Sequence, residues 1–138
     1  MTPADVSAAV LQSFVAHEAR LLDEQRWDEW AALFAPEGWY WLPADSTHTD
    51  PLAQASHLYD DALLREVKLT RLRNPQAHSQ QPPGRCHHLL QATELLRADA
   101  TAQRFETRTP FLYTELRAGQ TVQLPGVATH HLRLHDGQ

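Results

Sequence analysis

The strongest constraint on the fold is a run of strict alternation in the second half of the chain. Within residues 102–113, every second position from 105 onward carries an aromatic or β-branched side chain: Phe105, Thr107, Thr109, Phe111 and Tyr113. Arg104, Glu106 and Arg108 share the opposite face of the same run. Because successive side chains of a strand point to opposite faces, the run predicts a strand with one buried and one solvated face, as in antiparallel sheets.

The flanking segments predict partner strands for this run. Residues 86–97 predict one long strand and residues 121–134 another. The stretch 117–120, Arg-Ala-Gly-Gln, predicts the hairpin turn that precedes the last strand. Within that strand, Pro125-Gly126 indicates a bulge or an edge position. The second half of the chain is therefore expected to form an antiparallel meander.

The first half of the chain is predicted to be mainly helical. Thr2 and Pro3 suit a helix start. The apolar face expected for this helix comprises Val6, Val10, Phe14, His17 and Leu21, widened by Leu11 and Leu22. Its polar face comprises Glu18, Arg20, Asp23 and Glu24. A second helix is expected where Trp27, Trp30, Ala31 and Phe34 share one face.

Short strands and a third helix complete the predicted elements. Residues 39–42 and 57–59 predict strands, and a helix capped by Asp60 or Asp61 is expected to reach residue 73. Residues 74–85 hold three prolines and predict a long loop. Helices on one face of a curved antiparallel sheet make an α+β fold, expected here as one domain over residues 1–138 with an internal cavity.

Composition excludes several classes of protein. The chain has one cysteine, Cys86, so it cannot by itself form a disulfide, a zinc site with two cysteines or an iron–sulfur cluster. Its formal net charge of −5 argues against nucleic-acid binding. No apolar run is long enough to span a membrane, and a cytoplasmic location is expected.

Two histidine pairs, at 87–88 and 130–131, are the main candidates for chemistry. Strand parity places His88 and His130 on the buried face. With a carboxylate from Asp60 or Glu94, these histidines have the residue types of a two-histidine metal site. Alternatively, Asp60, His88 and His130 supply acid–base groups for a small isomerase or dehydratase. The alternative to both is structural: the histidines pack or hydrogen-bond, and an aspartate caps the third helix.

Two blocks of sequence carry a more specific signal. The first runs from Glu18 through Trp27-Asp28-Glu29-Trp30 to Gly38-Trp39-Tyr40-Trp41-Leu42-Pro43. The second contains His57-Leu58-Tyr59-Asp60-Asp61, Ala77-His78-Ser79-Gln80 and Arg85 to Leu89. Together they resemble the small (β) subunit of aromatic-ring-hydroxylating, Rieske-type dioxygenases, over residues 14 to 135.

This resemblance implies a fold similar to nuclear transport factor 2 and a non-catalytic assembly role. It implies a large (α) subunit that carries a Rieske cluster and a mononuclear iron, and a homotrimer of this chain within an α3β3 hexamer. No catalytic residue, cofactor or metal is then expected on this chain. Subunit contacts are expected at Trp39, Trp41, His78 and Arg85. Family members continue beyond Asp136-Gly137 with a further strand, which is expected to be absent here.

Overall fold

The computed structural model describes residues 6–43, 56–73 and 85–134. The described helices and strands are, in chain order, α1 (Ala8–Asp23), α2 (Trp27–Ala32), β1 (Tyr40–Pro43), β2 (Ser56–Asp60), α3 (Ala62–Arg73), β3 (Arg85–Leu90), β4 (Glu94–Asp99), β5 (Arg104–Arg117) and β6 (Gln120–Arg133). They fall into two compact units. One comprises α1 and β3 to β6, and the other comprises α2, β1, β2 and α3; each is described by itself below.

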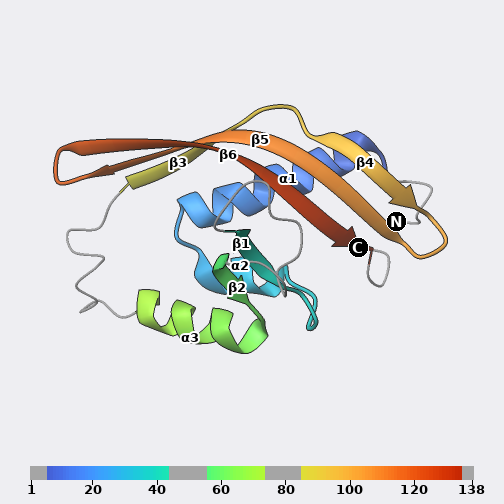
Figure 1. Cartoon of the computed structure of the whole chain (residues 1–138), viewed down its shortest axis with the longest axis horizontal. Helices are drawn as coiled ribbons and strands as arrows, with labels where there is room; N and C mark the ends of the chain where they lie inside the picture. Colours follow the sequence, from blue (N-terminus) through green and yellow to red (C-terminus); the bar gives the residue numbers. More distant parts are fainter. Residues whose placement is uncertain (1–5, 44–55, 74–84, 135–138) are drawn as a thin grey trace. The chain divides into compact units, whose positions relative to one another are not determined.

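Strand β5 is the centre of a curved antiparallel sheet (Figure 1). It pairs with β6 along its whole length, from Arg104↔Arg133 to Arg117↔Gln120. A strand has only two edges, so β3 and β4 share the other edge of β5. The predicted alternation is confirmed over residues 104–109, where Phe105, Thr107 and Thr109 are at most 5% exposed, whereas residues 110–115 are all half-buried.

The prediction of one long strand over residues 86–97 is wrong, because the structure divides it into β3 and β4. The break lies opposite Pro110 of β5, which has no backbone N–H to offer a neighbouring strand. Gln91 still donates its N–H to the Pro110 carbonyl at 2.9 Å, and residues 91–93 then leave the strand conformation. The proline therefore explains why the edge is interrupted here.

The β5–β6 hairpin confirms the predicted turn. Its two linking residues, Ala118 and Gly119, have φ values of 52° and 78°. Two successive positive φ values are the geometry of a type I′ turn, which matches the twist of the paired strands. The alternative of a bulge at Pro125-Gly126 is wrong, since the register runs through it without a shift. Gly126 instead leaves room for the Phe111 ring, because a Cβ there would lie 2.4 Å from Phe111 Cζ.

Helix α1 lies against the sheet, where Leu11 packs with Phe105 and Leu134 in the core (Figure 1). The helix begins later than predicted: Ser7 is its N-cap and accepts the N–H of Val10 at 3.3 Å, so the start at Thr2 is wrong. The predicted apolar face is confirmed at Leu11 and Leu21, whereas His17 is exposed. The buried residues of α1 are Leu11, Val15, Ala19 and Leu21.

The second unit confirms the predicted helix cap and two short strands. Strands β1 and β2 pair antiparallel, with Tyr40 opposite Asp60. Asp61 caps α3 by accepting the N–H of Leu64 at 3.0 Å. In the core, Trp30 packs edge-on against Phe34 and Tyr40, and α2 contacts α3. Helices and an antiparallel sheet thus give the α+β fold predicted from the sequence, whereas the single domain over residues 1–138 stays a prediction.

Candidate functional site: two acid–histidine pairs under helix α1

Asp23, the last residue of α1, joins this helix to strand β3. One carboxylate oxygen accepts the backbone N–H of His88 at 3.0 Å, and the other lies 2.6 Å from His88 Nδ1. The two side chains are only 12% and 17% exposed. A negative charge at the C-terminal end of a helix is disfavoured by the helix dipole. The contact with β3 therefore accounts for an acidic residue at this position.

Glu18 makes the corresponding contact between α1 and strand β6. Its Oε1 lies 2.8 Å from Nε2 of His130, and both side chains are mostly buried. Because the carboxylate can only accept, Nε2 carries the proton of this hydrogen bond. The two pairs together attach α1 to strands on opposite edges of β5.

Two aromatic rings and a thiol lie next to the Asp23–His88 pair. The His88 ring lies 4.9 Å from the ring of Tyr113 and 5.6 Å from that of Phe111. Cys86 Sγ lies 4.0 Å from Asp23 Oδ1. Burial is the main cause that raises the pKa of the Cys86 thiol, and burial likewise raises the pKa of the Tyr113 phenol. Both groups are therefore neutral at physiological pH, and the thiol lacks the lowered pKa of a nucleophilic cysteine.

The structure confirms that His88 and His130 face inward but keeps them apart. They lie opposite Tyr113 and Thr107, which are six positions apart on β5 (113 minus 107). At about 3.4 Å per residue, this separates them by about 20 Å along the strand. Each histidine is bonded to its own carboxylate, so the two do not converge on one substrate atom. Within the described ranges, no cluster of three or more His, Cys, Asp or Glu residues has metal-binding geometry.

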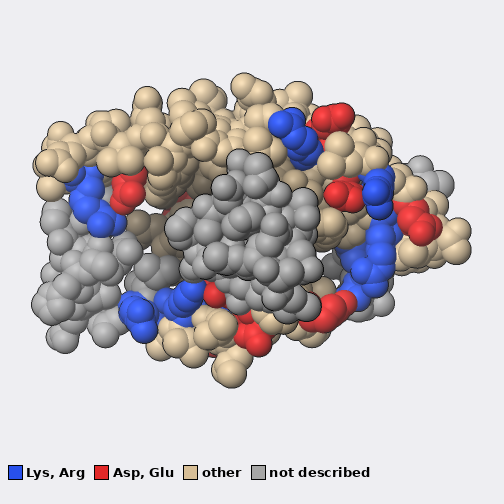
Figure 2. All heavy atoms as spheres, in the orientation of Figure 1, with Lys and Arg blue, Asp and Glu red and all other residues tan. Residues whose placement is uncertain are grey.

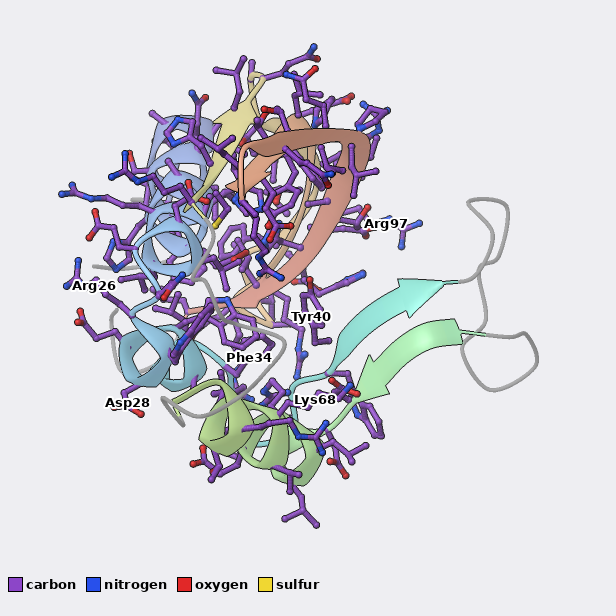
Figure 3. The ribbon with its side chains drawn as sticks, turned by 90° about the vertical axis from the view of Figure 1, so that its left-hand side faces the viewer. Arg26, Asp28, Phe34, Tyr40, Lys68 and Arg97 are labelled. Carbon is purple, nitrogen blue, oxygen red and sulfur yellow. The ribbon has the colours of Figure 1, made fainter. Side chains whose placement is uncertain are left out.

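The two carboxylates expected from the sequence as partners of the histidines, Asp60 and Glu94, make other contacts. Glu94 is exposed on β4, opposite Arg108. Asp60, in the α2–α3 unit, is 5% exposed, and both of its carboxylate oxygens accept from Lys68 Nζ, at 2.9 and 2.7 Å. Lys68 is labelled in Figure 3. Asp60 therefore serves as the buried end of an ion pair between β2 and α3.

The buried cation of the same unit is Arg65. Its guanidinium lies 3.8 Å from the centre of the Phe34 ring and donates to the Gly38 carbonyl at 2.7 Å. Burial is the main cause that lowers the pKa of Arg65. The contacts fix the turn after α2 onto α3.

Of the four residues expected at subunit contacts, two have described side chains. Trp39 is 50% exposed and Arg85 is exposed at the start of β3. The side chain of Trp41 and the whole of His78 lie outside the described residues. Half-exposure of a tryptophan fits a contact surface, and the contact itself stays a prediction.

Glu18 and Asp23 are the site residues that sequence reasoning missed, since they were expected on the outer face of the helix. A signal for Glu18 was present: Leu11, Val15, Glu18 and Leu22 are spaced at i, i+4, i+7 and i+11. An acid in an otherwise apolar stripe predicts a buried partner, and the sequence offered His130. For Asp23, the signal was an acid where the helix dipole disfavours one.

Comparison with known protein families shows which family the chain belongs to. Residues 17–138 match the family model described as ring hydroxylating beta subunit. The chain belongs to this family. The small subunit of 2-halobenzoate 1,2-dioxygenase from Burkholderia cepacia is 33% identical over 113 residues, which cover 78% of this chain and 67% of that protein. The small oxygenase component of the p-cumate 2,3-dioxygenase system from Pseudomonas putida is 28% identical over 135 residues, covering 96% and 74%.

Solved structures of other members share the fold. The beta subunit of benzoate 1,2-dioxygenase from Burkholderia mallei superposes with a TM-score of 0.78 at 20% identity, covering 93% of this chain and 80% of that one. A chain of naphthalene 1,2-dioxygenase gives a TM-score of 0.75 at 16% identity, covering 96% and 75%. The family and fold predicted from the two sequence blocks are thus confirmed.

The residues of this chain do not fit a Rieske cluster. Such a cluster takes two cysteines and two histidines, and the single thiol here is a neutral group beside Tyr113.

On the face shown in Figure 2, cationic and anionic side chains are interspersed. Among the residues described, there is no helix with the length and apolarity to span a membrane.

Proposed function

We propose that this chain is the non-catalytic small subunit of an aromatic-ring-hydroxylating dioxygenase. A large subunit of the same enzyme carries the Rieske cluster and the mononuclear iron. The small subunit forms a homotrimer, on which three large subunits assemble into a cytoplasmic α3β3 hexamer. The role of this chain is to provide a rigid scaffold for that assembly.

The observation that carries this proposal is the family match over residues 17–138. The geometry supports a scaffold role, because the candidate acid–base groups serve as internal ties: His88 with Asp23, His130 with Glu18, and Asp60 with Lys68. A hydrogen-bonded buried pair rigidifies the fold at the points where it joins a helix to a strand.

An aromatic carboxylate is the substrate class we propose for the assembled enzyme. The relatives named for 2-halobenzoate, p-cumate and toluate support this class, since each of those compounds is a benzoate derivative. The large subunit would select among such acids, because the groups that react with substrate lie there.

The proposed subunit contacts are made by Trp39, Trp41, His78 and Arg85. On the β5–β6 hairpin, Val122 and Leu124 lie on the same face of β6 and are 48% and 55% exposed, which adds to the support for a contact surface. Leu116 and Val127, 45% and 52% exposed, lie on the opposite face of the sheet. Apolar side chains exposed side by side on a sheet favour burial against another chain. The two tryptophans would supply the large contact areas typical of interface centres.

Co-expression with a large subunit of the family tests this function. We expect a complex that elutes as a hexamer, with iron bound to the large subunit and turnover of a benzoate derivative. Arg85→Ala should weaken complex formation. Arg97→Ala is the matched control, since Arg97 is also an exposed arginine of the sheet, 84% exposed and projecting away from it (Figure 3). Equal loss of assembly in the two variants would refute the placement of the surface, and the absence of any complex would refute the function.

A further inference from the structure

Two residues that lie directly opposite each other on β5 and β6 each carry a buried polar atom. Thr107 is fully buried on β5 and lies opposite His130 on β6. Thr107 Oγ1 and His130 Nδ1 are both buried, and neither has a hydrogen-bond partner among the described residues. Buried polar atoms are nearly always hydrogen-bonded in folded proteins, so two neighbouring exceptions indicate that something joins them.

The chemistry of the two atoms is complementary to a water molecule. Because Nε2 carries the proton of the bond to Glu18, Nδ1 is an acceptor in the neutral form of this imidazole. The Thr107 hydroxyl can donate and accept. Directly opposed side chains in an antiparallel pair have Cβ atoms about 4.5–5.5 Å apart. A water between them can donate to Nδ1 and exchange a second hydrogen bond with the hydroxyl.

The neighbouring threonine shows that the fold satisfies such hydroxyls elsewhere. Thr109 is also fully buried, on the same face of β5, and its Oγ1 lies 2.9 Å from Thr93 Oγ1. The position opposite Thr107 on β4 is instead Leu95, which offers no polar atom. Thr109 therefore has a hydrogen-bond partner within the protein. Thr107 instead lies between the aliphatic side chain of Leu95 and the imidazole of His130.

We propose that this pair is a binding site for one buried water molecule. The water joins Thr107 to His130, and His130 in turn is bonded to Glu18. The result is a continuous polar link from β5 through β6 to α1. The flanking core residues Leu95, Phe105 and Leu132 are apolar, so the bound water is expected to exchange slowly with solvent.

The isosteric variants Thr107→Val and Thr109→Val test this site in the full chain. If water occupies the site, Thr107→Val deprives it of one partner and lowers the Tm by a few degrees. If the site holds no water, the same change removes an unpaired buried hydroxyl and raises the Tm. Thr109→Val is the matched control and lowers the Tm in either case, because it breaks the bond with Thr93.

Oxygen-17 magnetic relaxation dispersion provides a second test that does not depend on stability. The wild-type chain should contain one more long-lived internal water than Thr107→Val. Should that variant fail to fold, a high-resolution crystal structure of the wild-type chain decides the matter. Density for one water within hydrogen-bond distance of both atoms supports the site, and side chains packed without such density overturn it.

Discussion

Replacing Asp23 by alanine is predicted to loosen the attachment of α1 to the sheet. Asp23 accepts two hydrogen bonds from His88, one from the backbone N–H at 3.0 Å and one from Nδ1 at 2.6 Å. In the variant, both donors lose their partner in a mostly buried position. The loss should therefore destabilise the fold well beyond what a surface substitution does.

The magnitude follows from these two bonds. Hydrogen bonds to a charged group contribute about 1.5–3 kcal/mol each, or about 3–6 kcal/mol for two. Removing a negative charge from the C-terminal end of α1 stabilises the helix and offsets about 0.3–1 kcal/mol of this loss. Water that reaches the two partly exposed donors replaces some of the lost hydrogen bonding and further reduces the loss of stability. We expect a net decrease in the free energy of unfolding of about 2–4 kcal/mol.

Urea unfolding followed by circular dichroism measures this change, with Glu24→Ala as the matched control. Glu24 adjoins Asp23 and forms a surface ion pair with Arg20 at 2.6 Å, in which the arginine is 72% exposed. Such exposed pairs contribute up to about 1 kcal/mol. If Asp23→Ala loses no more stability than Glu24→Ala, the argument that Asp23 is a tie between helix and sheet fails.

Two further predictions concern the inner face of the sheet. Gly126→Ala should destabilise the chain by about 1–3 kcal/mol, because the new Cβ would clash with the Phe111 ring. Thermal unfolding should show that the same substitution costs less stability in a Phe111→Leu background. Equal losses of stability in both backgrounds would disprove the clash. Stability should also fall at alkaline pH, because burial raises the pKa of the Cys86 thiol above 9.0 and that of the Tyr113 phenol above 10.0. The unfolded chain loses these protons first, so the stabilisation that these two groups contribute is full below about pH 9 and declines above it. Tyr113→Phe should flatten the alkaline decline, and an alkaline limb unchanged by this substitution would contradict the assignment.

The sequence predicted those elements whose signal is local. Alternation along 102–113 and the Ala118-Gly119 turn determine the central hairpin, because side-chain direction and positive φ are properties of adjacent residues. The break between β3 and β4 was missed because its cause, Pro110, lies on the neighbouring strand. A segment read alone does not show which residue will lie opposite it.

The candidate site was predictable only in part for the same reason. Parity correctly placed His88 and His130 on the buried face of their strands. Their partners, Asp23 and Glu18, are distant in sequence, 65 and 112 positions away, and were assigned to a solvated helix face. Pairing across such separations depends on how the helix packs, which composition and periodicity do not specify.

The most direct test of the central claim is turnover by purified components. This chain, a large subunit of the family and their co-expressed complex should each be assayed on a benzoate derivative with an electron donor. We predict turnover by the complex, none by this chain alone, and an undiminished kcat per complex in His88→Gln and His130→Gln variants that still assemble. Turnover by this chain alone, or a kcat lost in either variant while assembly persists, would contradict the account.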